Sequence, residues 1–228
     1  MKKHIKTPNS EEFQLERVVF FNDAVFAIAI TLLIIDIKVP ELHSTSISDN
    51  ELTFKLSALI PKFIGFVISF FVIGLYWLAH HRMFKFVTAI NQRLLWANLL
   101  FLLPIVIMPF STSFLSEYYF SNLRLPFGIY TINICMTGFF SYRLWKIITN
   151  PKNKVSDTID KVIIQYNTAR ALTIPFIFIF TFLVSFITTY YFFIPPFIPL
   201  TTRLITRHYF KKYPEIMNKY YRNDGIAK

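Results

Sequence analysis

The chain has 228 residues, of which 54% are hydrophobic and 18% aromatic, whereas charged residues make up only 16%. This composition excludes an ordinary water-soluble domain and predicts an all-α integral membrane protein surrounded by membrane lipids. The net charge of +11 comes from short clusters between apolar runs. Such clusters are typical of membrane topology signals, so no nucleic-acid partner is expected.

The apolar runs predict six transmembrane helices, because a helix needs roughly 20 residues to cross the hydrocarbon core. The last run, Val162–Ile205, is too long for one span at about 1.5 Å per residue. We divide it near Tyr190–Pro196, where prolines favour a helix break. The first four spans are expected at Val18–Val39, Leu56–Leu78, Leu94–Leu115 and Leu125–Trp145.

Basic residues alternate between rich and poor connections along the chain. The connections rich in Lys and Arg are the N-terminal segment, Arg82–Arg93, Arg143–Lys161 and the chain from Arg203 onward. Because basic loops stay on the cytosolic side, both termini are expected in the cytosol and the protein in the cell membrane. The predicted organisation is a cytosolic segment at residues 1–17, a six-helix transmembrane domain at 18–206 and a basic cytosolic tail at 207–228.

The first span begins with polar residues and continues with an apolar stripe. At about 100° per residue, Ile28, Thr31, Leu32 and Ile35 lie on one side of the helix. Asp23 lies about 140° from Ile28, so we expect it to face neighbouring helices. From periodicity alone, ordinary helix packing also explains the stripe.

Three motifs in order resemble the lysosomal-type transmembrane potassium channel family, in its bacterial single-repeat branch. The first is Arg17-x-x-x-Phe21-Asn22-Asp23 with the apolar run after it. The others are Tyr76-Trp77-Leu-Ala-His80-His81-Arg82 and Asn91-Gln-Arg-Leu-Leu-Trp96-Ala-Asn98, with Pro109-Phe-Ser-Thr112 at the far end of the third helix. The family usually has Ser or Thr where this chain has Asn22, and the resemblance is specific only from about Arg17 to Thr112.

This resemblance implies a homotetramer of six-helix subunits, with the first helix of each lining a central pore for potassium. Carried over by position, Ile28 resembles a constriction residue, Thr31 a polar residue just beyond it and Ile35 a second apolar ring. Such rings hold a pore shut by dewetting, and a widened ring favours the ion that loses water most easily. Modest preference for potassium over sodium is therefore expected, with proton leakage also possible in family terms.

Polar side chains near the cytosolic ends of the second and third helices are expected to brace the pore helix. They are Trp77, His80, His81, Trp96 and Asn98, close in depth to Arg17 and Asp23. Anchoring at the membrane interface is an equal alternative for Trp77 and Trp96. Adjacent histidines do not share a helical face, so no metal site is expected. Cys135 is the single cysteine, and no cofactor beyond permeant ions is expected.

The competing function is a proton-coupled secondary transporter of a small cation or solute, although the early helices lack the breaks typical of transporters. A purely structural membrane partner is a further alternative. An enzyme is not expected, because Asp23, Asp36 and a few hydroxyls are too dispersed within the spans to form a catalytic site.

Overall fold

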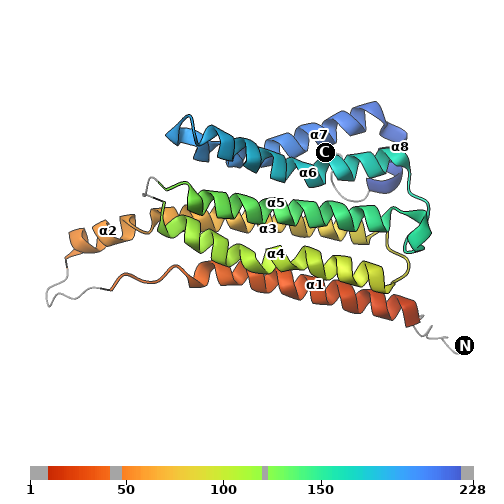
Figure 1. Ribbon diagram of the computed structural model, residues 1–228, viewed down its shortest axis with the longest axis horizontal. Helices are drawn as coiled ribbons and strands as arrows, with labels where there is room; N and C mark the ends of the chain where they lie inside the picture. Colours follow the sequence, from red (N-terminus) through yellow and green to blue (C-terminus); the bar gives the residue numbers. More distant parts are fainter. Residues whose placement is uncertain (1–9, 42–47, 120–122, 222–228) are drawn as a thin grey trace, which may run out of the picture.

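The structure is a computed structural model that describes residues 10–41, 48–119 and 123–221. Regular structure in these residues is helical, and the long helices run side by side (Figure 1). Short 3₁₀ segments, Pro151–Asn153, Thr189–Phe193 and Pro195–Phe197, lie between the later helices. The α-helices are α1 Ser10–Ile35, α2 Asp49–Ser57, α3 Ile60–Phe84, α4 Gln92–Glu117, α5 Leu125–Ile148, α6 Lys161–Val184, α7 Ile198–Lys212 and α8 Pro214–Tyr221.

The helices pack in an order that leaves α1 at one flank. α1 contacts α3 and α4, α4 contacts α5, α5 contacts α6, and α6 contacts α7. Figure 1 shows α1 along one edge of the bundle and α6 and α7 along the opposite edge. α1 therefore has one side against its own bundle and one side with no helix of the described chain against it.

Local sequence explains where the long helices begin. Asn91 precedes α4, and its side-chain oxygen accepts a hydrogen bond from the backbone N–H of Leu94 at 2.9 Å. Asp160 caps α6 in the same way, accepting from Val162 at 2.7 Å. Pro61 and Pro126 lie in the first turns of α3 and α5, where a missing N–H costs no helical hydrogen bond.

Four helices of the described chain are long and apolar enough to cross a membrane. They are Glu12–Ile35 within α1, Ile60–Phe84, Gln92–Glu117 and Lys161–Val184. α5 also has 24 residues, but it is not among these four apolar spans. Its polar side chains are buried against neighbouring helices, among them Thr131, Asn133, Thr137 and Ser141. Because α5 lies between α4 and α6, the protein itself covers these groups.

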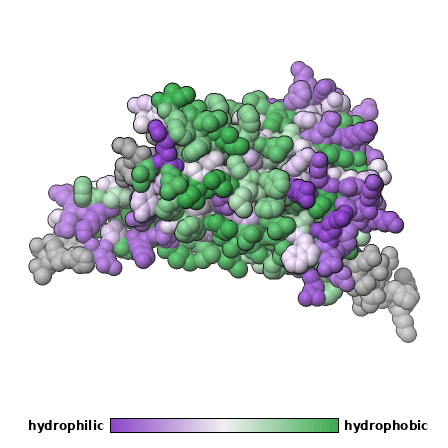
Figure 2. Space-filling view, in the orientation of Figure 1, coloured by the Kyte–Doolittle hydropathy of each residue, from purple (hydrophilic) through white to green (hydrophobic). Residues whose placement is uncertain are grey.

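The molecular surface carries a broad apolar band. Figure 2 shows hydrophobic residues across the middle of the face and hydrophilic residues gathered at both ends. Exposed apolar side chains include Phe71, Val106, Phe110, Ile132 and Phe176, all more than half exposed. Water-soluble monomers rarely expose a continuous apolar surface of this kind. The all-helical fold and this band together define an integral membrane protein, as the sequence predicts.

Two of the predicted early spans have different ends in the structure. α1 starts at Ser10, so residues 10–17 of the predicted N-terminal segment are helical, and residues 1–9 lie outside the described chain. α1 ends at Ile35 because Asp36, Lys38 and Pro40 follow within a few residues. Leu56 and Ser57 belong to the separate short helix α2, since the second long helix starts near Pro61.

The C-terminal third also differs from the sequence-based division. α6 ends at Val184, before the expected break near Tyr190–Pro196. α7 has only 15 residues, and it continues through the expected boundary at 206. Part of the predicted tail is the packed helix α8, in which Met217 and Tyr221 are buried. Amphipathic segments such as α8 fold against the bundle because their apolar side chains have a core to join.

Candidate functional site

Helix α1 has a buried side with the spacing of a packed helix. Asn22, Phe26, Ala29 and Leu33 recur every three or four residues and are at most 4% exposed. They pack into the core formed with α3 and α4. This side fixes the rotation of α1 about its own axis.

The predicted stripe lies on the exposed side of α1. Ile28 is 58% exposed, Leu32 41% and Ile35 67%, and Thr31 is also exposed. Thr31 donates its hydroxyl hydrogen to the carbonyl oxygen of Ile28 at 2.9 Å, within the same helix. Packing inside one chain therefore does not account for the stripe, which is left for lipid or another copy of the chain to cover.

A buried polar cluster ties α1 to α3 and α4. The Asn98 side-chain amide donates to Asn22 Oδ1 at 2.7 Å. His80 Nε2 lies 2.9 Å from Asn98 Oδ1 and 3.4 Å from Asn22 Nδ2. All three side chains are at most 3% exposed. Three polar residues from three helices thus satisfy one another in an apolar core, which specifies how those helices meet.

Aromatic rings hold the imidazole of this cluster in place. His80 stacks on Phe101 with ring centroids 5.3 Å apart and on Phe84 at 4.3 Å. Its neighbour His81 points elsewhere and is exposed, lying 6.0 Å from the ring of Trp77. Within the described residues, no group of three potential ligands is placed to hold a metal ion.

Asp23 has a direct partner on α3. The indole N–H of Trp77 donates to Asp23 Oδ1 at 2.8 Å. This bond lies one residue along α1 from Asn22, so both polar contacts hold the same turn of the helix. The carboxylate faces a neighbouring helix and not the apolar stripe.

Three other predicted residues do not join these contacts. Arg17 and Phe21 line an open groove of about 440 Å³ between α1 and α4, together with Asn98. The guanidinium group of Arg17 lies over the ring of Phe13. Arg17 is six residues before Asp23 along α1. Trp96 is 61% exposed and lines a different groove, between α4 and α5.

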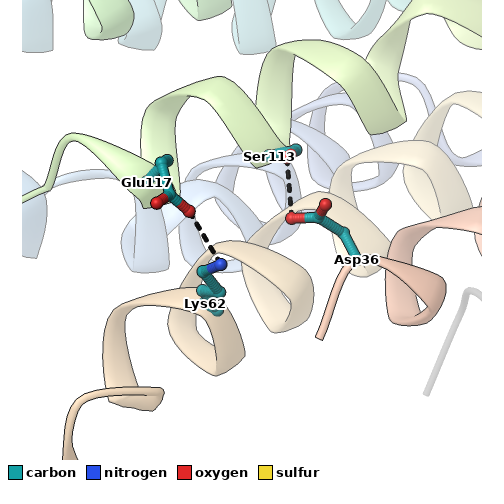
Figure 3. Close-up of polar contacts among 4 residues, drawn as sticks. All are labelled: Asp36, Lys62, Ser113 and Glu117. Carbon is teal, nitrogen blue, oxygen red and sulfur yellow. Dashed lines mark hydrogen bonds and ion pairs between the residues drawn. The ribbon is translucent and has the colours of Figure 1, made fainter. Parts of the chain in front are cut away.

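Sequence reasoning missed a second set of polar contacts at the other end of α1. Ser113 on α4 donates to Asp36 Oδ2 at 2.7 Å, and Lys62 forms an ion pair with Glu117 at 2.7 Å (Figure 3). Both pairs join α4 to a neighbouring helix or its end. Asp36 was detectable in the sequence, since an acidic residue at the end of an apolar run requires a partner.

A hydroxyl chain inside the bundle was missed as well. Thr112 donates to Ser69 at 2.7 Å, and Ser69 lies 2.8 Å from the Tyr130 hydroxyl. The chain links α4, α3 and α5 in the buried interior. Isolated hydroxyl residues within apolar runs gave no sequence signal of which helices they join.

The comparisons with known proteins agree with this class of fold. Residues 17–109 match the family model described as endosomal/lysosomal potassium channel TMEM175. A potassium channel of Streptomyces collinus is 43% identical over 102 residues, which cover 45% of this chain and 48% of that protein. A potassium channel of Chamaesiphon minutus is 30% identical over 181 residues, covering 79% of this chain and 88% of that protein.

A solved structure has a similar fold. The crystal structure of a lysosomal potassium-selective channel TMEM175 homolog from Chamaesiphon minutus superposes with a TM-score of 0.68 and 28% identity. The match covers 83% of this chain and 98% of that one. The chain belongs to the TMEM175 family, which confirms the resemblance seen in its motifs. The family is one of ion channels, in agreement with the expectation that the chain is not an enzyme.

Proposed function

We propose that this chain is a potassium-permeable cation channel in which four copies surround a pore lined by α1. The observation that carries the proposal is the two-sided environment of α1. One side is fixed by Asn22, Phe26, Ala29 and Leu33, while the stripe of Ile28, Thr31, Leu32 and Ile35 is exposed. The relatives' names as potassium channels support potassium as the permeant ion.

The main grooves and cavities of a single chain lie away from this stripe. Within the described residues, these main grooves and cavities are lined by side chains other than Ile28, Thr31 and Ile35. A pore along α1 therefore needs several copies, and four around an axis is the arrangement that the family resemblance implies. The partner is the chain itself, in a homotetramer.

Six membrane-crossing segments per subunit are compatible with the helix lengths. α5 has the length of a full span, since its 24 residues rise about 36 Å. The 3₁₀ segment Pro195–Phe197 runs directly into α7, and together they rise about 28 Å, of which the last turn is basic with Lys211 and Lys212. α7 returns alongside α6 toward the end of the bundle that holds α8 (Figure 1).

The apolar rings supply the gate and the selectivity of the proposed pore. Four copies of Ile28, with Leu32 and Ile35 further along, form narrow rings without any carboxylate. Water leaves such a constriction readily, and an ion crosses only when the ring widens and the ion sheds part of its hydration shell. Potassium is less strongly hydrated than sodium, so the rings favour potassium modestly.

The polar contacts of α1 keep the stripe aimed at the axis. Asn22 and Asp23 attach the start of the membrane-crossing part of α1 to α3 and α4. Asp36 attaches the other end to α4 through Ser113. With both ends held, the stripe cannot rotate away from the axis unless these bonds break.

The basic end of the bundle is placed in the cytosol of the proposed channel. The start of α1, the α3–α4 connection, the α5–α6 connection and the end of α7 lie at one end (Figure 1). Most of the Lys and Arg residues lie there, whereas the opposite end has few, including Lys38, Lys55, Lys62 and Arg124. This asymmetry supports both termini in the cytosol of a cell-membrane protein.

Ion flux from liposomes tests the proposal. We expect purified protein to release potassium down its gradient faster than protein-free vesicles, with slower flux for sodium. Ile28→Asn should change the rate or the selectivity, because an amide in place of each isoleucine hydrates the constriction. The matched control is Ile34→Asn, on the same helix but about 120° away from Ile28.

Two outcomes would contradict the proposal. Equal effects of Ile28→Asn and Ile34→Asn would show that the stripe does not line the pore. Absence of flux in folded tetramers would remove the channel function altogether. A proton-coupled transporter is separated by collapsing the proton gradient, because passive potassium flux persists and coupled flux stops.

A further inference from the structure

A groove at the basic end of the bundle has an apolar floor and three cations that form no ion pair within the described residues. It runs between α4 and α5 and holds about 670 Å³. Arg93 and Arg143 line both this groove and an adjoining hollow of about 310 Å³, which Lys146 also lines. No acidic residue is among those that line either part.

Two of the cations are held in place without being neutralised. Arg93 donates to Asn153 Oδ1 at 3.0 Å, and Lys146 lies over the ring of Tyr142 at 5.1 Å from its centroid. Both partners are uncharged. Within the described residues, Arg93, Arg143 and Lys146 form no ion pair, so their charge remains available to an anion.

The apolar part of the groove continues from the cations toward the centre of the bundle. Trp96 and Leu100 follow Arg93 by roughly one and two turns of α4, and Phe139 precedes Arg143 by about one turn of α5. Trp96 is 61% exposed, Leu100 45% and Phe139 55%. The apolar path from Arg93 to Leu100 rises about 10 Å along the helix axis.

We propose that this groove binds an anionic phospholipid, with its phosphate group between Arg93, Arg143 and Lys146 and an acyl chain along Trp96, Leu100 and Phe139. Guanidinium groups form paired hydrogen bonds to phosphate oxygens, and the ammonium of Lys146 adds a third cation. The basic residues lie at headgroup depth, at the ends of two membrane-length helices. A free phosphate ion would use the cations and leave the apolar floor uncovered.

Native mass spectrometry of the full chain in detergent tests this site. The binding of phosphatidylglycerol is measured by titration and compared with the binding of phosphatidylcholine that has the same acyl chains. The test variant is Arg93→Gln/Arg143→Gln. The charge-matched control is Lys211→Gln/Lys212→Gln, which removes two exposed lysines from the end of α7.

We expect phosphatidylglycerol affinity to fall about 25-fold in the test variant, since each of the two basic residues near an anionic headgroup contributes roughly fivefold. The control should bind as the wild type does, phosphatidylcholine should bind weakly, and inorganic phosphate should not displace the lipid. Thermal unfolding of each variant checks that the bundle is intact.

Several results would overturn the site. Equal loss in the control would make the binding a general charge effect, and equal binding of phosphatidylcholine would remove the role of the cations. Displacement by inorganic phosphate would assign the site to a soluble anion. A change of oligomeric state in the test variant would assign the groove to a second copy. The readout involves no ion flux, so its failure would not touch the proposed channel function.

Discussion

Trp77 on α3 donates its indole N–H to the carboxylate of Asp23 on α1 at 2.8 Å, so the bond joins two residues that are 54 positions apart in the sequence. The bond crosses from the second long helix to the first at the level where α1 becomes apolar. An indole N–H is only a donor, and an ionised carboxylate only an acceptor, so the pair has a single polarity. The fit of these two side chains makes the contact directly testable.

Trp77→Phe should destabilise the protein by about 1 to 2 kcal/mol, because it removes the donor and leaves the Asp23 carboxylate without its partner on α3. The measurement is the thermal unfolding midpoint in detergent. Trp96→Phe is the matched control, since Trp96 is 61% exposed and lies on the groove between α4 and α5. Equal shifts for the two variants would show that the hydrogen bond contributes nothing.

His80→Phe and His81→Phe should differ sharply although the residues are adjacent. His80 is buried between Asn22 and Asn98, and a phenyl ring there leaves both amides short of a partner. We expect a loss of roughly 1 to 3 kcal/mol for this change. His81 is exposed, so His81→Phe should stay within about 0.5 kcal/mol of wild type. Similar unfolding midpoints for both variants would contradict the buried cluster.

Gly138→Ala should lower the stability of the protein, whereas Gly74→Ala should not. A Cβ at Gly138 on α5 would overlap the ring of Pro175 on α6, which cannot turn aside as a flexible chain does. A Cβ at Gly74 meets nothing within 4 Å. Because alanine favours helix by up to about 1 kcal/mol, Gly74→Ala should be neutral or stabilising. A stabilised Gly138→Ala variant would mean that α5 and α6 are further apart than the structure has them.

Tyr221 should ionise at a higher pH than a free tyrosine side chain. Burial raises the pKa of Tyr221 from 10.0 to about 12, against the opposing effect of the hydrogen bond from Asn167 at 2.8 Å. The neutral phenol therefore contributes its full stability below pH 10, and this contribution is lost as the pH rises toward 12. Ultraviolet difference titration of Tyr221→Phe against wild type should show the loss of a late-titrating tyrosine.

Tyr220→Phe is the control for that titration, because Tyr220 is only partly buried. The late titration should persist in this variant, because Tyr221 is intact. If Tyr221→Phe instead removed a group that titrates near pH 10, α8 would not be docked against the start of α6.

The positions of most long helices could be predicted from the lengths of the apolar runs alone. The cores of the predicted spans coincide with α1, α3, α4, α5 and α6, because each apolar run must be helical to satisfy its backbone in lipid. The ends did not follow, since they depend on capping groups such as Asn91 and Asp160 and on where Pro61 falls. α8 was missed because a short amphipathic segment is recognisable only once its docking surface exists.

Part of the site could also be predicted from the sequence. Asn22, His80 and Asn98 stand out as polar residues at the ends of apolar runs, and such groups require partners. Which helix supplies each partner depends on the tertiary structure and cannot be predicted from the sequence. For this reason the sequence predicted a bracing contact for Trp96, which instead lies on the groove between α4 and α5. The roles of Ile28, Thr31, Leu32 and Ile35 in a pore stay predictions, because they depend on copies of the chain beyond the one described.

The hydroxyl of Thr31 has one more property that follows from its bond to the Ile28 carbonyl. A free hydroxyl can bind a cation through its oxygen or donate its hydrogen to an anion. Because the hydrogen of Thr31 is already used inside its own helix, only the oxygen lone pairs remain to face outward. A ring of such hydroxyls would present only acceptor oxygens. It would therefore coordinate a partly dehydrated cation and would provide no hydrogen-bond donor for chloride.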